Sequence, residues 1–433
     1  MMQTILIRGG RPLAGTITPA SAKNSALPLL AATLLCGGPC TLHRLPRLAD
    51  IDTSLALLRA VGAAAARRGQ DVVTRPAAAL SGDIPPALAG AMRSSVFYLA
   101  PLLCRAGWVR LPLPGGCRLG PRPVDIHLAG LAAMGATVEI GAGTVVLRRR
   151  GPLRGVDFTL RLPSVGATET LLMAAACAQG ATVLRGAACE PEIEDLARFL
   201  NACGGCVTGA GTPVVVVRGR PLHGCCFTPL PDRIAACTYL AAAASAGGQV
   251  TVAGCQPRHF GPFLDFLRAL GCRAAVSGRR VTLCRDPAVP LQGGQAVFAA
   301  AYPGFATDAA PLAAALLLTA RGASTVRDGL FQNRFACAAG FAALGAAVEN
   351  RGPTLQIGGG AALRGAEVTA PDLRGGAALA VAALAAAGTT ALRDPGHIRR
   401  GYADLPGELR RLGADAAALT AHDAPACRRQ ETK

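Results

Sequence analysis

The chain has 433 residues, of which 51% are hydrophobic, so it is long enough for two domains and too apolar for a disordered protein. Its net charge of +18 at pH 7 permits a nucleic acid or a small anion as a partner. The arginines are scattered and only 4% of the residues are aromatic, which argues against a base-stacking surface and therefore against nucleic acid.

Neither a leader peptide nor a membrane span is predicted. The first residues, "MMQTILIRGGRPLAG", lack a charged segment followed by a long apolar stretch. The longest late uncharged run, Gly375 to Leu392, is broken by "AAGTT" and predicts a buried helix followed by a strand. We therefore expect a cytoplasmic protein with no membrane partner, in which the sixteen cysteines stay reduced.

A glycine that closes an apolar stretch recurs every 67 to 74 residues, starting with "LRAVGA" and "LAAMGATVEI". Each copy predicts a helix that ends on a left-handed glycine and is followed by a strand. The six glycines are Gly62, Gly135, Gly204, Gly271, Gly345 and Gly413.

A second signature has the same period: an Ala/Leu-rich helix, a glycine and a β-branched strand, as in "MAAACAQGATVL". Together the two signatures predict six βαβα-type repeats, three per domain. The Ala/Leu-rich helices are almost uncharged and must be buried on all sides, whereas the other helices are amphipathic and can face solvent. The expected fold is an inside-out α/β barrel with the active site in the cleft between two domains.

Prolines in "TPLPDRI" (228–234) mark the linker between the two halves. We predict one domain from residues 22–231, with repeats 1–3. The other domain comprises residues 1–21 and 232–419, with repeats 4–6 closed by the N-terminal strand. Residues 420–433 are polar and are expected to form a loose tail.

Polar residues stand where the buried helices are expected to begin. Serine and aspartate can cap such helices, but a cation there faces the positive end of the helix dipole. Several such cations are best explained by a bound anion among them. The residues are Lys23 and Asn24, Arg93, Ser164 to Gly166, Asp232 and Arg233, Asp308, and Asp372 to Arg374; Lys23 and Lys433 are the chain's only lysines.

The Pro/Gly-rich stretch 111–127, "LPLPGGCRLGPRPVDIH", breaks the repeat and predicts a long lid loop over the active site. Cys117 lies there beside Arg118 and Arg122, and neighbouring guanidinium groups make a thiol more reactive. The alternative is that Cys117 is one of sixteen incidental cysteines.

The segment "CGGC", Cys203 to Cys206, has the spacing of a metal or redox motif. Cys225, Cys226 and Cys237 lie downstream, but a zinc site would need a second correctly spaced pair, and the pair found there, Cys225–Cys226, is adjacent. No metal is therefore predicted.

These motifs resemble the UDP-N-acetylglucosamine enolpyruvyl transferase (1-carboxyvinyltransferase) family across nearly the whole chain. The cysteine loop distinguishes that family from the 5-enolpyruvylshikimate-3-phosphate synthases, which share the six repeats. The matching segments, in order, are "SAKNSALPLL", "PGGCRLGPRPVDIH", "PSVGATET", "EPEIEDLARFL", "NRFACAAGFAALGA", "APDLRGGAAL" and "HIRRGY".

The resemblance implies transfer of the enolpyruvyl group of phosphoenolpyruvate to the 3-hydroxyl of UDP-N-acetylglucosamine, the first committed step of peptidoglycan synthesis. It implies no metal or cofactor, small-molecule substrates as partners, and a monomer or weak oligomer. Cys117 would be the general acid and the position that fosfomycin attacks, Asp308 the base on the sugar hydroxyl, and Asp372 an aid near the reacting carbon.

The resemblance also implies the binding residues. Lys23, Arg93 and Arg122 would hold the phosphate of the donor, and Arg374 and Arg400 its carboxylate. The sugar nucleotide and the rest of the substrate site would involve Asn24, Arg122, Pro123, Val124, Asp125, Ile126, Ser164, Val165, Gly166, Leu330 and Arg334.

Three acids usual in the family are absent here: Ala235, Gln332 and Arg399 stand in their places. Two alternatives to the active enzyme follow. The chain could be a divergent non-catalytic paralogue that binds the sugar nucleotide, or an enolpyruvyl transferase that acts on another hydroxyl acceptor.

Overall fold

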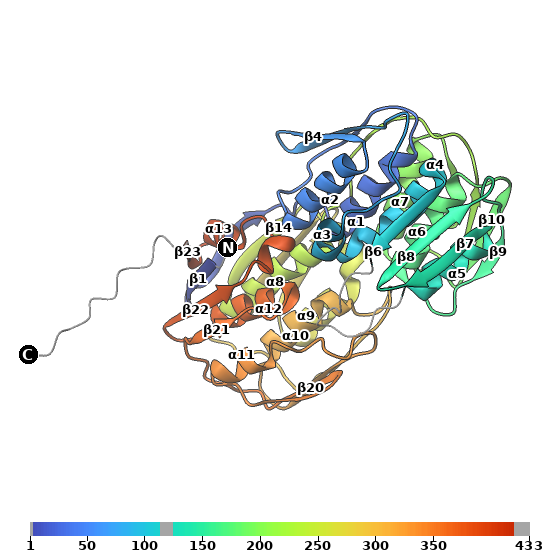
Figure 1. The fold of residues 1–433 in the computed structure, drawn as a ribbon. Coiled ribbons are helices and arrows are strands. Elements are labelled where there is room, and N and C mark those ends of the chain that lie inside the picture. Colours follow the sequence, from blue (N-terminus) through green and yellow to red (C-terminus); the bar gives the residue numbers. More distant parts are fainter. Residues whose placement is uncertain (1–2, 113–123, 420–433) are drawn as a thin grey trace, which may run out of the picture. The chain divides into compact units, whose positions relative to one another are not determined.

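The computed structural model of the protein describes residues 3–112 and 124–419. The chain forms two compact units. Unit 1 comprises Met1–Pro19, Arg233–Ala300 and Phe305–Lys433, and unit 2 comprises Ala20–Asp232 and Ala301–Gly304. The chain thus leaves unit 1 after its first two strands and returns at Arg233, directly after the prolines of "TPLPDRI" (Figure 1).

Unit 2 contains three successive repeats of helices and short strands. Its elements are α1 (Lys23–Ala32), η1 (Thr33–Leu35), β3 (Cys40–Leu42), α2 (Ala49–Ala60), β4 (Ala64–Arg68), β5 (Asp71–Arg75), α3 (Pro86–Ala91), η2 (Arg93–Tyr98), α4 (Leu99–Ala106), β6 (Trp108–Pro112), α5 (Asp125–Ala133), β7 (Ala136–Gly141), β8 (Thr144–Arg149), β9 (Asp157–Thr159), α6 (Val165–Ala176), β10 (Ala181–Arg185), α7 (Pro191–Ala202), β11 (Cys206–Thr208), β12 (Val214–Arg218) and β13 (Cys226–Phe227).

Unit 1 repeats the same plan. Its elements are β1 (Gln3–Arg8), β2 (Leu13–Ile17), α8 (Arg233–Ala246), β14 (Gly248–Ala253), η3 (Pro257–Phe260), α9 (Gly261–Ala269), β15 (Arg273–Ser277), β16 (Arg280–Arg285), β17 (Ala296–Ala299), η4 (Thr307–Ala309), α10 (Ala310–Leu317), β18 (Ser324–Asp328), α11 (Ala338–Ala343), β19 (Val348–Arg351), β20 (Thr354–Ile357), β21 (Glu367–Thr369), α12 (Leu373–Ala383), β22 (Thr389–Asp394), η5 (Ile398–Arg400), α13 (Leu405–Arg411) and β23 (Asp415–Leu419).

Each repeat has its own sheet with one common topology. In repeat 5, for example, β17 pairs parallel to β18, β18 antiparallel to β20, and β20 antiparallel to β19. The sheet of repeat 2 has three strands, and a parallel bridge between Asp83 and Arg110 stands where the others have their parallel edge strand. This regularity bears out the prediction of six equivalent repeats.

Strands distant in sequence complete three of the sheets. β1 lies between β22 and β23, as expected for a last repeat closed by the N-terminal strand. β2 pairs parallel to β14, so the main part of unit 2, Ala20–Asp232, is inserted between β2 and α8. In unit 2, β13 returns to pair with β3 of the first repeat.

The six repeat glycines have the predicted backbone conformation. Their φ values lie between 90° and 103°, a backbone conformation that is unfavourable for any residue with a side chain. In every repeat the glycine follows an α-helix and precedes a strand, as Gly135 does between α5 and β7. The sequence signature therefore marks a helix end that needs glycine.

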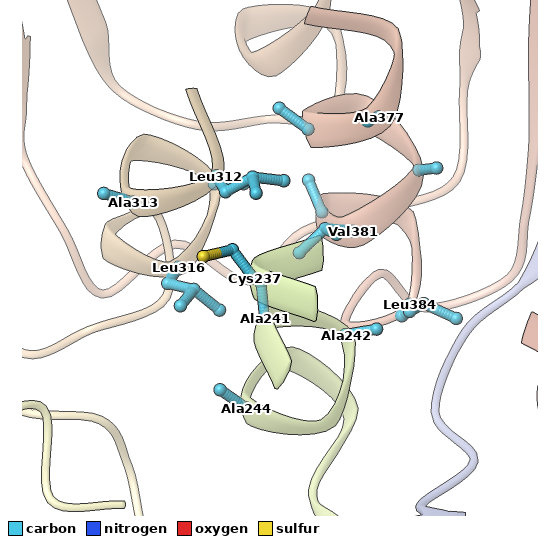
Figure 2. Packing of buried hydrophobic residues seen from close by; sticks show 14 of the residues in the cluster. Cys237, Ala241, Ala242, Ala244, Leu312, Ala313, Leu316, Ala377, Val381 and Leu384 are labelled. Atoms are coloured by element: carbon cyan, nitrogen blue, oxygen red, sulfur yellow. The ribbon is translucent and has the colours of Figure 1, made fainter. Parts of the chain in front are cut away.

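The Ala/Leu-rich helices form the core, as the inside-out fold requires. In unit 1, α8, α10 and α12 pack on one another, and Cys237, Leu312 and Val381 point into their common interface (Figure 2). Every residue of α10 and α12 is buried. Small alanine side chains let these helices approach closely.

Two predicted element boundaries were wrong. Arg93 and Asp308 do not begin α-helices: each lies in a 3-10 turn, η2 or η4, that precedes α4 or α10. Pro101 and Pro311 lie in the first turns of α4 and α10, where a proline ring is tolerated, so the α-helices start after the 3-10 turns.

The predicted loop 111–127 is shorter at both ends. Leu111 and Pro112 pair with β8 as the end of β6, and Asp125 to His127 open α5. Residues 113–123 and the predicted tail, 420–433, lie outside the described residues. In the part of the chain that is described, none of the helices combines the length and apolarity needed to span a membrane.

Candidate active site

Lys23 has an acidic partner that the sequence interpretation missed. It is the first residue of α1, and its Nζ donates a hydrogen bond to Oδ2 of Asp50 at 3.0 Å. Asp50 is buried in the first turn of α2, where an acid would ordinarily be interpreted as a favourable dipole partner. The expectation that this cation needs a ligand anion was therefore incomplete, because Asp50 supplies negative charge from within unit 2.

Arg93 lies near the buried imidazole of His127. Burial and the positive charge of Arg93 lower the pKa of His127 to about 4. His127 belongs to the first turn of α5, and its Nε2 would lie 3.1 Å from a Cβ added to Gly166. Arg93, α5 and the start of α6 therefore meet in one region of unit 2.

The predicted nucleotide-binding segments lie beside each other in that region. Ser164 caps α6 by accepting a hydrogen bond from the Ala167 N–H at 3.3 Å, as predicted for a helix-capping serine. Asp125, at the start of α5, pairs with Arg161, which precedes α6. The segments Val124 to Ile126 and Ser164 to Gly166 thus converge, and Asn24 lies next to Lys23 on α1.

Three buried acids lie close together at α6: Glu169 belongs to the helix, and Glu190 and Glu192 lie near it. Burial, then the charges of Glu192 and Glu190, raise the pKa of Glu169 well above its usual value. All three side chains are buried. Sequence reasoning did not single out Glu169, although an acid inside an otherwise uncharged helix was a visible signal.

In unit 1, Asp308 lies between two guanidinium groups. Its Oδ2 accepts a hydrogen bond from Nη2 of Arg374 at 2.8 Å, and its Oδ1 accepts one from Nη2 of Arg334 at 3.3 Å. Adjacent cations favour the ionised form of a carboxylate. Asp308 does not cap α10, in contrast to the expectation for an acid at that position.

Asp372 caps α12 as predicted. Its Oδ1 accepts hydrogen bonds from the N–H groups of Arg374 and Gly375 at 2.8 and 2.9 Å. The cap fixes the backbone of Arg374, whose side chain is 8% exposed. Asp372, Arg374 and Asp308 therefore form one connected group.

Asp328 and Asp394 occupy equivalent positions in repeats 5 and 6, and each accepts hydrogen bonds from the backbone of a segment that contains predicted site residues of unit 1. Asp328, at the end of β18, accepts hydrogen bonds from the Leu330 and Phe331 N–H groups and pairs with Arg334. Asp394, at the end of β22, accepts hydrogen bonds from the backbone of the turn leading to η5 and Arg400. Sequence reasoning missed both, although "RDG" and "RDPG" occupy the same place in repeats 5 and 6.

Some predicted residues have no structural account. Cys117, Arg118, Arg122 and Pro123 lie outside the described residues. Of the three positions where the family's usual acids are missing, Ala235 is buried in α8, whereas Gln332 and Arg399 are exposed.

The fold is that of an enolpyruvyl transferase. Residues 7–409 match the family of EPSP synthase (3-phosphoshikimate 1-carboxyvinyltransferase). The solved enolpyruvyl transferase NikO from Streptomyces tendae superposes with a TM-score of 0.85 at 27% identity, over 97% of this chain and 99% of that one. EPSP synthase from Acinetobacter baumannii, 18% identical with a TM-score of 0.70, has the same fold over 97% of this chain and 100% of its own.

Curated relatives narrow the class. UDP-N-acetylglucosamine 1-carboxyvinyltransferase 2 of Caldanaerobacter subterraneus subsp. tengcongensis is 40% identical over 94% of this chain and 98% of its own. UDP-N-acetylglucosamine 1-carboxyvinyltransferase of Solidesulfovibrio magneticus is 41% identical over 97% of this chain and 100% of its own. The chain belongs to the UDP-N-acetylglucosamine 1-carboxyvinyltransferase family, which confirms the resemblance inferred from its motifs.

Proposed function

We propose that this protein transfers the enolpyruvyl group of phosphoenolpyruvate to the 3-hydroxyl of UDP-N-acetylglucosamine and releases phosphate. The observation that carries the proposal is the connected group of Asp308, Arg374 and Asp372. In this group the carboxylate of Asp308, the proposed base, pairs with the buried side chain of Arg374, whose backbone Asp372 holds. Full-length identity of about 40% to curated members of the family supports the choice of substrates.

The donor carries a phosphate and a carboxylate, so it needs cations for both ends. We assign the phosphate to Lys23, Arg93 and Arg122, and the carboxylate to Arg374 and Arg400. Lys23 pairs with Asp50, and Arg374 pairs with Asp308. The donor would therefore compete with two internal carboxylates for its cations.

The acceptor would lie along Asn24, Arg122 to Ile126, Ser164 to Gly166, Leu330 and Arg334. Asp308 would take the proton of the sugar hydroxyl as its oxygen bonds to the central carbon of the donor. Cys117 would protonate the methylene carbon, giving a tetrahedral ketal. The Cys117 thiolate then takes a proton from the new methyl group, the double bond re-forms and phosphate leaves, while Asp372 assists near that carbon.

The product of this reaction is a precursor of peptidoglycan, so the proposal includes roles in cell wall formation, cell shape and cell division. We place the enzyme in the cytoplasm as a monomer or weak oligomer, and expect fosfomycin to inactivate it at Cys117. The described cysteines are free thiols, which fits a reducing compartment.

Phosphate release from phosphoenolpyruvate tests this function. The rate should be zero without acceptor and should saturate with UDP-N-acetylglucosamine. Shikimate 3-phosphate, the acceptor of the related synthases, serves as the control and should give no release. Folded protein that binds UDP-N-acetylglucosamine by calorimetry but never releases phosphate would instead identify a non-catalytic binding protein.

A further inference from the structure

Four cysteine thiols of unit 2 converge away from the residues assigned above. Sγ of Cys203 lies 3.6 Å from Sγ of Cys36 and 3.3 Å from Sγ of Cys225. The sulfurs of Cys36, Cys40 and Cys203 all lie within 4.8 Å of one another, and these three residues are buried. Across residues 3–112 and 124–419, this is the one place where three or more potential metal-ligating side chains gather this closely.

Strand pairing between the two ends of unit 2 creates this cluster. Cys36 and Cys40 flank the "GGP" turn that leads into β3, Cys203 follows α7, and Cys225 directly precedes β13. β13 pairs parallel to β3, and the Thr41 N–H donates a hydrogen bond to the Cys225 carbonyl at 2.9 Å. The cluster therefore combines Cys203 of "CGGC" with the upstream pair Cys36 and Cys40, and Cys206 takes no part in it.

The two loops that carry the thiols pack backbone against backbone. A Cβ on Gly224 would lie 2.0 Å from the carbonyl oxygen of Pro39. The Gly37 N–H donates to the Leu222 carbonyl at 2.7 Å, and the His223 N–H donates to the Cys203 carbonyl at 2.8 Å. The sulfurs are thus presented by a rigid support, as a preorganised ligand site requires.

We propose that Cys36, Cys40, Cys203 and Cys225 form a binding site for a thiophilic divalent cation of the Zn²⁺ type. Zn–S bonds of about 2.3 Å at tetrahedral angles place neighbouring sulfurs about 3.8 Å apart. The separations from Sγ of Cys203, 3.3 Å to Cys225 and 3.6 Å to Cys36, are near that value. Cys225 does not belong to the group of three sulfurs that lie within 4.8 Å of one another, so its side chain would have to move closer to complete the site. Each thiol that binds the cation releases its proton to solvent.

A cation already lies beside this site. Nη1 of Arg105 donates hydrogen bonds to the carbonyl oxygens of Leu34 and Cys36 at 2.8 and 3.5 Å. A divalent cation bound to four thiolates forms a complex with net negative charge, which the positive charge of Arg105 would partly offset. The site would tie the first repeat of unit 2 to its last strand, and it is independent of the proposed transfer reaction.

Titration of the reduced full-length protein with Co²⁺ tests the proposal under anaerobic conditions. We expect one Co²⁺ per chain, with sulfur-to-cobalt charge-transfer absorption and the visible bands of a tetrahedral site, both lost on addition of Zn²⁺. Folded protein that shows no such absorption would overturn the proposal.

Cys203→Ser should abolish the cobalt absorption, because the sulfur of Cys203 lies between those of Cys36 and Cys225 and is close to both. Cys206→Ser is the matched control from the same "CGGC" segment and should retain the full signal, since Cys206 lies on β11 outside the cluster. Absorption that survives in Cys203→Ser would place the metal elsewhere and contradict the assignment.

Thiol mapping covers the case in which Cys203→Ser does not fold. In the wild-type protein, Zn²⁺ should slow alkylation of Cys36, Cys40, Cys203 and Cys225, and leave the exposed Cys226 unaffected. Equal rates with and without Zn²⁺ would refute the proposal. A disulfide between Cys203 and Cys36 or Cys225 that forms in place of metal binding would also refute it.

Discussion

Nη2 of Arg374 donates a hydrogen bond to Oδ2 of Asp308 at 2.8 Å, although 66 residues separate the two along the chain. Asp308 lies in η4, which precedes α10, and Arg374 lies in the first turn of α12, so the two residues come from the starts of different buried helices of unit 1. The pairing joins the proposed base to a proposed carboxylate-binding cation. A donor carboxylate that binds Arg374 would loosen its hold on Asp308 at the moment when a base is needed.

Asp308→Asn removes the proposed base but retains a side chain that can accept the Arg374 hydrogen bond. We expect kcat for phosphate release to fall by about 10²–10⁴-fold, the usual contribution of a positioned general base. Asp265→Asn, at an exposed acid paired with Arg268, is the control and should retain full activity. A normal kcat in Asp308→Asn would assign the base elsewhere.

Lys23→Arg tests whether the lysine at the start of α1 needs its compact ammonium group. The Lys23 side chain is only 13% exposed and is held 3.0 Å from Asp50, so a planar guanidinium has little room there. We expect the variant to fold, with a lowered melting temperature because the larger group crowds the site, and to lose most of its turnover. Arg268→Lys, an exchange at an exposed site, should alter neither quantity. Full activity in Lys23→Arg would mean that any cation suffices.

Arg334→Ala should destabilise unit 1 strongly. Arg334 is 1% exposed and pairs with Asp328, whose side chain is also fully buried. Removing one partner of a buried pair leaves an uncompensated charge, which costs about 3–5 kcal/mol of unfolding free energy. The exposed pair of Arg351 and Glu349 supplies the control, because Arg351→Ala should cost at most about 1 kcal/mol. Equal effects in urea unfolding would contradict this account of the buried pair.

His127 should make the folded protein sensitive to acid. Its pKa is lowered from 6.5 to about 4, so between these values the unfolded chain binds a proton that the folded chain does not. Stability should therefore decrease as the pH falls through this window, by up to about 3 kcal/mol. Comparison of urea unfolding at pH 7 and pH 4.5 should show a smaller loss in His127→Gln than in the wild type.

His223→Gln is the control for this pH dependence, since His223 is exposed. It should lose as much stability on acidification as the wild type does. An undiminished loss in His127→Gln would show that groups other than His127 govern the response.

Gly135→Ala isolates the conformational role of the repeat glycines. Gly135 has φ +103°, and an added Cβ would meet nothing within 4 Å. The cost is therefore purely that of a left-handed backbone, about 1–2 kcal/mol for a residue with a Cβ. Gly90→Ala, in α3 with similar open space, should instead stabilise by about 0.5–1 kcal/mol. Thermal unfolding measures both, and shifts of the same sign would refute the argument.

The repeat architecture could be predicted from the sequence, because the responsible signals are local. A glycine after an apolar stretch requires a left-handed backbone wherever it folds, and an uncharged Ala/Leu helix must be buried. Ser164 and Asp372 were predictable as caps for the same reason, since a cap acts within a few residues. Motif order was enough to indicate the family.

Contacts between distant residues could not be predicted in this way and become visible in the folded chain. The sequence placed Lys23, Arg374 and Asp308 at helix starts, but could not show that Asp50 and Asp308 already neutralise the two cations. Likewise Cys36 and Cys203, 167 residues apart, come together because β13 returns to pair with β3. Such contacts depend on strand pairing and helix packing across the whole chain, which no local pattern of residues encodes.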